Sequence, residues 1–121
     1  MSLFMAMALI VEIATIELAD GKTEAGLIAA SKVFQDDFLN HQPGFIKREL
    51  VRSSEGKYLD IVHWRSQEDI DALMQNIDSS KEVQSYFSIM KFDSENPTNG
   101  VEHYSSIGVY ESQQSQYEVS K

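Results

Sequence analysis

The residues with the clearest capacity for acid–base chemistry are three histidines, and two of them lie in segments with strand character. An ordinary imidazole titrates near pH 6.5, so a histidine can take up a proton at neutral pH as a general base. His63 directly precedes the single tryptophan, Trp64, and His103 lies towards the C-terminus. His63 and His103 are therefore the candidate catalytic residues. His41 ends a predicted helix, where a cation simply suits the helix dipole.

The adjacent pair His63 and Trp64 carries a geometric constraint. Neighbouring side chains of a strand point to opposite faces of the sheet, so these two cannot line one pocket unless a bulge intervenes. Trp64 either stacks on a flat aromatic ligand or fills the core at the end of the sheet. If Trp64 faces the helices, His63 faces the other side and is an interface residue instead of a base.

Other aromatic residues recur at helical spacing and extend the predicted pocket around Trp64. Such a wall suits a small hydrophobic or aromatic ligand, although similar stripes also build ordinary cores. The predicted substrate pocket consists of Trp64, Phe34, Phe38, Tyr86 and Phe87. We expect no metal site, because cysteine is absent and no carboxylate stands at ligand spacing from a histidine.

The composition is that of one acidic domain. The chain has 121 residues, enough for one hydrophobic core, and a formal net charge of −9. That charge argues against nucleic acid and against anionic membranes as partners. The absence of cysteine and of a signal-peptide pattern favours a cytoplasmic protein. We expect residues 1–7 to be a leader or cloning remnant, 8–110 the domain, and 111–121 a polar tail.

Hydrophobic periodicity and turn residues predict four strands and two helical regions. The strands are expected at about 8–19, 45–53, 58–64 and 101–110. The first helix begins after Thr23 and is stopped by Pro43. The second region begins after Ser66 and consists of two short helices. Asp69 is predicted to return a hydrogen bond to the Ser66 backbone, as in a capping box.

The element order β-α-β-β-α-β is that of the ferredoxin-like, split βαβ fold, an α+β class with a four-stranded antiparallel sheet. Right-handed crossovers place the first and third strands in the middle. The second strand is too charged for a sheet centre and is predicted at an edge, because it contains Lys47, Arg48, Glu49 and Arg52. The helices cover one face only, and the first strand is apolar on both faces. We therefore predict that a second copy covers the other face, giving a homodimer.

Two motifs resemble one protein family. Gln42-Pro43-Gly44-Phe45-Ile46 precedes a hairpin, and Asp60-Ile61-Val62-His63-Trp64-Arg65-Ser66 runs into a helix. Together they resemble the antibiotic biosynthesis monooxygenase family of dimeric α+β barrel proteins, over about residues 8–110. The resemblance implies a homodimer with a small pocket between sheet and helices. Activities in that family include cofactor-free oxidation of aromatic polyketides, haem degradation and processing of small signalling molecules.

The residues of the haem-degrading branch are missing from this chain. That branch has an asparagine on the first strand, a tryptophan in the second helix and a histidine further along. Here the second helical region holds Leu73 and Met74, and residues 83–90 contain no histidine. Many other members carry a histidine late in the second helix, where this chain has Gln75 and Asn76. The resemblance therefore does not imply haem degradation.

Two functions follow from these observations. The first is a cofactor-independent monooxygenase acting on a small aromatic or phenolic compound. A base would remove a proton, and the resulting anion would react with O₂ in a site that excludes water and orients the substrate. The alternative is a non-catalytic dimeric module that binds a small ligand or a partner. The aromatic pocket favours the first, and the missing family histidine favours the second.

Overall fold

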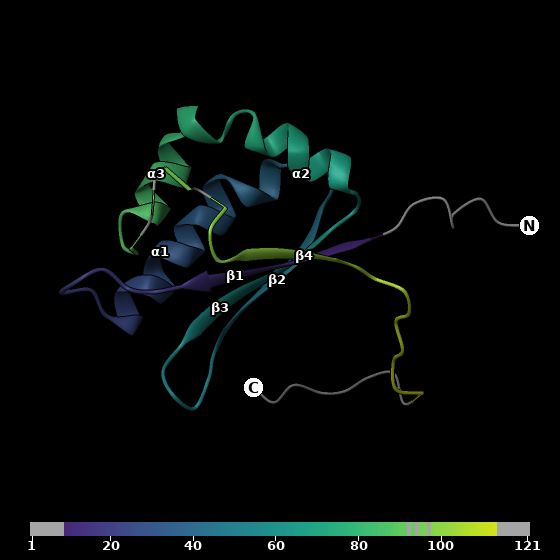
Figure 1. Cartoon of the computed structure of the whole chain (residues 1–121), viewed down its shortest axis with the longest axis horizontal. Coiled ribbons are helices and arrows are strands. Elements are labelled where there is room, and N and C mark those ends of the chain that lie inside the picture. The colour runs from purple at the N-terminus through teal and green to yellow at the C-terminus, as the bar shows by residue number, and fades with distance from the viewer. Residues whose placement is uncertain (1–8, 92, 94, 97, 114–121) are drawn as a thin grey trace, which may run out of the picture.

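The chain folds into one antiparallel sheet with helices over one of its faces (Figure 1). The computed structural model describes residues 9–91, 93, 95–96 and 98–113. The strands are β1 (Ile10–Ile16), β2 (Phe45–Arg52), β3 (Tyr58–Trp64) and β4 (Val101–Ser105). The helices are α1 (Glu24–Asp37), α2 (Gln67–Met74) and α3 (Lys81–Phe87), with 3₁₀ turns at Leu39–His41 and Ile77–Ser79.

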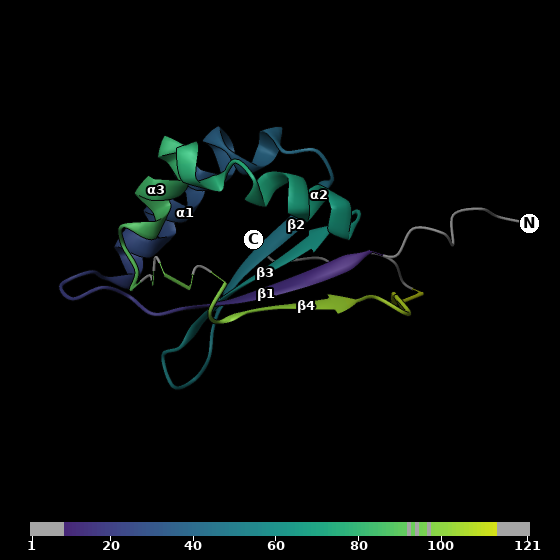
Figure 2. The ribbon, with the colours of Figure 1, turned by 45° about the horizontal axis from the view of Figure 1, so that its top comes forward.

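The sheet has the order β2-β3-β1-β4, and every neighbouring pair is antiparallel. This confirms the predicted α+β, ferredoxin-like architecture, with the first and third strands in the middle and the second at an edge. The helices lie together on one side of the sheet (Figure 2), and no helix of the described residues covers the opposite face. No helix in the described part of the chain is long and apolar enough to cross a membrane.

The strand register divides the side chains between the two faces of the sheet. Ile10 pairs with Trp64, and both side chains are buried on the helix side. Val11 pairs with His63 at the alternate positions, so these two side chains point to the open face. The predicted separation of His63 and Trp64 therefore holds. The shift between β2 and β3 lies at Phe45 and does not exchange the faces of β3.

The structure sets the ends of two strands differently from the sequence pattern. The first strand was expected over 8–19 but ends at Ile16, because the chain then leaves the sheet and Leu18 bridges to Met90. The last strand was expected over 101–110 but ends at Ser105, where its partner β1 begins. The predicted leader and residues 114–121 of the predicted tail lie outside the described residues.

Hydroxyl caps begin the helices as the sequence indicates. Thr23 Oγ1 accepts from the Gly26 N–H at 3.1 Å, and Ser66 Oγ accepts from the Asp69 N–H at 3.2 Å. The Asp69 carboxylate departs from the predicted capping box. It accepts from the Ser66 hydroxyl at 2.7 Å and from the Arg65 guanidinium at 2.8 and 2.9 Å. The neighbouring arginine supplies a counter-charge and two N–H donors, whereas the Ser66 backbone would supply one N–H.

The two motifs that carry the family resemblance pack against each other at this helix start. Gly44 has a φ of 83°, and its carbonyl accepts from the Arg65 N–H at 2.8 Å. A Cβ on Gly44 would lie 2.4 Å from the Asp69 side chain, closer than any side chain allows. Only glycine satisfies both the backbone angle and the contact, so this turn fixes how β2 begins beside α2.

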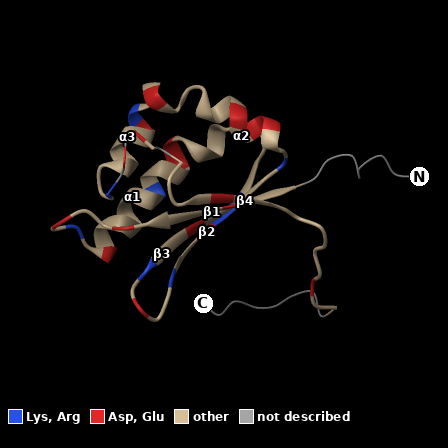
Figure 3. Cartoon of the chain, in the orientation of Figure 1, with Lys and Arg blue, Asp and Glu red and all other residues tan. Residues whose placement is uncertain are grey.

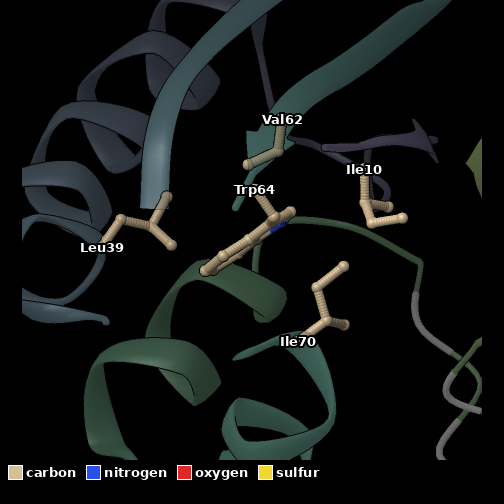
Figure 4. Packing of buried hydrophobic residues seen from close by; sticks show 5 residues of the cluster. All are labelled: Ile10, Leu39, Val62, Trp64 and Ile70. Carbon is tan, nitrogen blue, oxygen red and sulfur yellow. The ribbon is translucent and has the colours of Figure 1, made fainter. Parts of the chain in front are cut away.

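Trp64 is the centre of one hydrophobic cluster. Its side chain is 2 % exposed and packs with Ile10, Leu39, Val62 and Ile70 (Figure 4). These residues come from β1, the first 3₁₀ turn, β3 and α2. The tryptophan therefore joins the sheet to the elements that lie over it.

Replacing this ring should weaken the fold strongly. We expect Trp64→Ala to lower the free energy of unfolding by about 3–5 kcal/mol, as large aromatic truncations in cores do. Urea denaturation measures the change. Val33→Ala is the control, because Val33 is 52 % exposed on α1, away from the open face of the sheet, and its truncation should leave stability almost unchanged. A loss for Trp64→Ala below about 1 kcal/mol would contradict the packing described here.

Candidate active site between the sheet and the helices

A cavity of about 280 Å³ lies between the helix side of the sheet and the helices. Side chains from all four strands and all three helices reach its wall. The five residues predicted to form a pocket all line it: Trp64, Phe34, Phe38, Tyr86 and Phe87. The structure thus brings together side chains from three separate segments. That they bind a substrate stays a prediction.

The aromatic wall of the cavity is continuous from α1 to α3. The ring of Phe34 stacks on Phe38 at 5.4 Å and on Tyr86 at 4.4 Å, with 14° between the planes in both pairs. Trp64 forms the far end of the lining. A wall of aromatic rings of this kind offers apolar surface against which another aromatic ring can pack.

The most buried charges of the cavity wall are Arg48 on β2 and Asp60 on β3. Their side chains are 6 % and 9 % exposed and lie 3.0 Å apart. Arg48 Nη1 donates to Asp60 and to the Tyr86 hydroxyl, Nη2 donates to the Ser31 carbonyl and hydroxyl, and Nε donates to Gln35. These acceptors occupy all five N–H groups of the guanidinium. Arg48 therefore has no donor left for a ligand.

The other polar groups of this cluster, Asp60 and the Tyr86 hydroxyl, are also hydrogen-bonded within it. The Tyr86 hydroxyl donates to Asp60 Oδ2 at 2.8 Å. Burial raises the pKa of Asp60, and the Arg48 guanidinium and the Tyr86 hydroxyl oppose that rise. Burial and the Asp60 charge raise the pKa of Tyr86 well above its usual range, so the hydroxyl stays protonated and remains a donor. The cluster is a closed structural network.

Arg48 was among the charges that placed β2 at the sheet edge, and that position is correct. Its side chain, however, is not on the surface. It turns inward, where the Phe34 ring lies 5.5 Å and the Tyr86 ring 5.7 Å from its guanidinium carbon. Arg48 and Asp60 occupy helix-facing positions on neighbouring strands. Strand alternation alone did not indicate that these two charges meet.

A second polar group in the cavity wall is formed by Glu12 and His103. Glu12 on β1 pairs in register with His103 on β4, and His103 Nε2 lies 3.2 Å from Glu12 Oε2. Trp64 Nε1–H donates to the other carboxylate oxygen, Oε1, at 2.9 Å. The side chain of Glu12 is 19 % exposed and that of His103 32 %. His103 therefore touches both the cavity and solvent.

The other candidate catalytic residue, His63, lies outside this cavity. It stands on the open face of the sheet between Val11 and Lys47. Burial and the Lys47 charge lower the pKa of His63, and Glu49 opposes this. Strand alternation is the physical reason that His63 cannot reach the cavity that Trp64 lines. His41 is exposed in the 3₁₀ turn after α1.

Glu12 is the site residue that sequence reasoning missed. A signal was available, because Glu12 is a charged residue at a helix-facing position of an otherwise apolar strand, and an unpaired carboxylate is almost never buried. Its partner was not identifiable, since His103 lies 91 residues further along the chain. The pairing follows only from the β1–β4 register.

The surroundings of the cavity are acidic. Asp71 and Asp78 line it together with Glu12, and Figure 3 shows further acidic residues on α2 and α3. No group of three His, Cys, Asp or Glu side chains in the described part of the chain is placed to hold a metal ion. The guanidinium of Arg48 is already paired with Asp60, so it does not offset the Glu12, Asp71 and Asp78 carboxylates of the wall.

These features define an α+β protein with a small, aromatic-lined cavity beneath its helices. The model of the antibiotic biosynthesis monooxygenase family matches residues 9–85, well over half of the chain. The chain belongs to that family. No curated protein matches the chain significantly.

Solved structures share the fold at low sequence identity. SnoaB, a cofactor-independent oxygenase from Streptomyces nogalater, is 12 % identical, with a TM-score of 0.60 over 86 % of this chain and 96 % of its own. A Bordetella bronchiseptica protein named as a candidate antibiotic biosynthesis monooxygenase is 21 % identical, with a TM-score of 0.57 over 85 % of this chain and 99 % of its own. A conserved Methanosarcina mazei protein is 14 % identical, with a TM-score of 0.56 over 85 % and 95 %. These likenesses establish the fold.

The closed network around Arg48 makes a stability prediction. Arg48→Ala should lower the free energy of unfolding by about 3–5 kcal/mol, because it leaves the buried Asp60 without its counter-charge. Urea denaturation of Arg52→Ala is the matched control on the same strand. Arg52 pairs with Glu24 in solvent, so its loss should be far smaller. Equal effects of the two variants would show that the Arg48 network does not hold the fold together.

Proposed function

We propose that this protein is a cofactor-independent monooxygenase that acts on a small aromatic or phenolic compound bound in the cavity between sheet and helices. The observation that carries the proposal is the meeting of two features in one cavity. An aromatic wall suits a flat ring, and a histidine paired with a carboxylate, His103 with Glu12, lies at its rim. The fold shared with SnoaB, a cofactor-independent oxygenase, supports the same reaction class.

The size and charge of the cavity support a small, neutral substrate. Its volume of about 280 Å³ compares with roughly 150 Å³ for an engineered cavity that takes up benzene. One or two fused rings fit such a space. The carboxylates of Glu12, Asp71 and Asp78 at its wall repel anions, so a phenol or a dihydroxynaphthalene fits better than an aromatic acid.

His103 serves as the general base in this proposal. The buried cluster around Arg48 and Tyr86 has no free hydrogen-bonding capacity, whereas the His103 ring has one nitrogen engaged by Glu12 and one remaining. Removal of the phenolic proton makes the ring electron-rich enough to react with O₂. One oxygen atom enters the ring as a carbonyl, and the other leaves as water with two hydrogens of the substrate. The substrate itself supplies all the electrons.

We also infer that the open face of the sheet is covered by a second copy of the chain. Four outward positions of the two central strands are apolar and half-buried, namely Val11 and Ile13 on β1 and Leu59 and Ile61 on β3. Beyond β4, Ile107, Val109 and Tyr110 are 98 %, 68 % and 92 % exposed. Exposed apolar side chains beside an uncovered face of a sheet are typical of a protein interface. His63 lies within this face.

Two matched variants test which histidine is the general base. His103→Gln should slow oxygen uptake with a dihydroxynaphthalene by about 10²–10⁴-fold, as loss of a general base does. His63→Gln makes the same chemical change on the other face and should leave turnover near the wild-type rate. The background oxidation without protein is subtracted. Binding of the naphthol without turnover by the wild-type protein would favour the non-catalytic binding module.

The position of His63 predicts a pH effect on assembly. Burial and the Lys47 charge already lower the pKa of His63, and a second copy over the open face would withdraw the ring further from water and lower that pKa again. Assembly therefore favours the neutral ring, so the contribution of His63 to the dimer is complete above the ordinary pKa of histidine and is lost as the pH falls through the lowered pKa. We expect sedimentation to show a dimer at pH 7.5 that weakens towards pH 5. His63→Gln should reduce this dependence. A monomer at micromolar concentration at pH 7.5 would contradict the proposed assembly.

A further inference from the structure

Glu12 is an unexpected residue for its position. It stands in the middle of the sheet on the helix side of β1, between the helix-facing Ile10 and Ala14, with its side chain 19 % exposed. A carboxylate withdrawn from water destabilises a protein unless donors compensate it. Its two hydrogen-bond partners are Trp64 Nε1–H, at 2.9 Å from Oε1, and His103 Nε2, at 3.2 Å from Oε2. Each oxygen thus serves one ring.

We propose that Glu12 is the positioning residue that makes His103 a base, by fixing which nitrogen of the imidazole carries the hydrogen. An ionised carboxylate can only accept, so the neutral His103 ring must hold its hydrogen on Nε2. Nδ1 is then the nitrogen with a free lone pair. The inference rests on the proposed function and deepens it, because it names the atom that receives the substrate proton.

The proton balance of the step is simple. The phenolic O–H bond breaks, an N–H bond forms on Nδ1, and a phenolate and an imidazolium result. Glu12 stabilises the imidazolium through its negative charge at 3.2 Å. Since the His103 side chain is 32 % exposed, the ring can return its proton to water. Glu12 itself touches neither proton nor substrate in this step.

The variant Glu12→Gln tests this proposal, because Trp64 determines how the new amide group is oriented. The glutamine keeps the shape of the side chain but has one amide oxygen and one NH₂ group. The indole N–H can only donate, so it holds the amide oxygen towards Trp64. The NH₂ group then faces His103 Nε2, which must accept. The hydrogen moves to Nδ1, which then has no free lone pair to receive the substrate proton.

Nitrogen-15 NMR of protein labelled in its histidines reads the tautomer directly. At about pH 8.5, two units above an ordinary histidine, neutral rings dominate. The signals of His103 are assigned by their absence from His103→Gln. We expect the unprotonated nitrogen to be Nδ1 in the wild type and Nε2 in Glu12→Gln. His63 is the internal control and should keep one tautomer in both proteins.

A double variant checks the part played by Trp64. In Glu12→Gln combined with Trp64→Phe, no indole holds the amide oxygen, so the amide can turn and accept from His103 Nε2–H. The wild-type tautomer should return. A merely structural role of Glu12 would not produce this reversal.

A bound probe links the tautomer to proton transfer. We expect 4-nitrophenol to bind wild-type protein with an increased phenolate absorption, and to bind Glu12→Gln with similar affinity but as the neutral phenol. Turnover of the dihydroxynaphthalene should fall by about 10²–10⁴-fold in the same variant.

The outcomes separate this inference from the proposed function. Wild-type His103 with its hydrogen on Nδ1, or an unchanged tautomer in Glu12→Gln, would overturn the role of Glu12 and leave the cavity as the binding site. Failure of wild-type protein to bind either 4-nitrophenol or the dihydroxynaphthalene would overturn the proposed function itself. The wild-type spectrum decides the first question even if the glutamine variant does not fold.

Discussion

The buried ion pair of Arg48 and Asp60 is the constraint on which the cavity depends. A guanidinium that is only 6 % exposed is tolerated because each of its N–H groups has an acceptor. Those acceptors come from β3, α1 and α3, so the pair holds one edge of the sheet at a set distance from two helices. The cavity occupies the space that this spacing leaves. Because all its N–H groups are already bonded within the protein, Arg48 has no direct role in ligand binding.

The sequence predicted the fold well because local rules and global packing agree along most of the chain. Alternating strands, Thr23 and Ser66 at the starts of two helices, and the Pro43-Gly44 turn each have one dominant interpretation. The strand ends were predicted less well. The end of a strand depends on where its partner strand stops. β4 ends at Ser105, which pairs with Ile10, the first residue of β1. No local residue preference reports the length of a distant partner.

The candidate site likewise has features that the sequence predicted and features that it did not. The aromatic wall followed from helical spacing, and strand alternation separated His63 from Trp64, since both are properties of neighbouring residues. Glu12 with His103, and Arg48 with Asp60, are contacts between strands that pair only after folding. A charged residue in an apolar strand shows that a partner must exist, but it does not identify the partner. The chemistry of this site therefore depended on the register.

The central strand β1 joins the two functions proposed for the two faces of the sheet. Its outward residues Val11 and Ile13 supply apolar surface for assembly, while its inward Glu12 withdraws a charge from water beside Trp64. A hydrophobic residue at that inward position would pack without the desolvation penalty. A carboxylate in so unfavourable a place is typical of sites where stability is given up for activity. Trp64 contributes to both the stability of the fold and the geometry of the site. Its ring packs in the core, and its N–H donates to Glu12, the carboxylate that contacts His103.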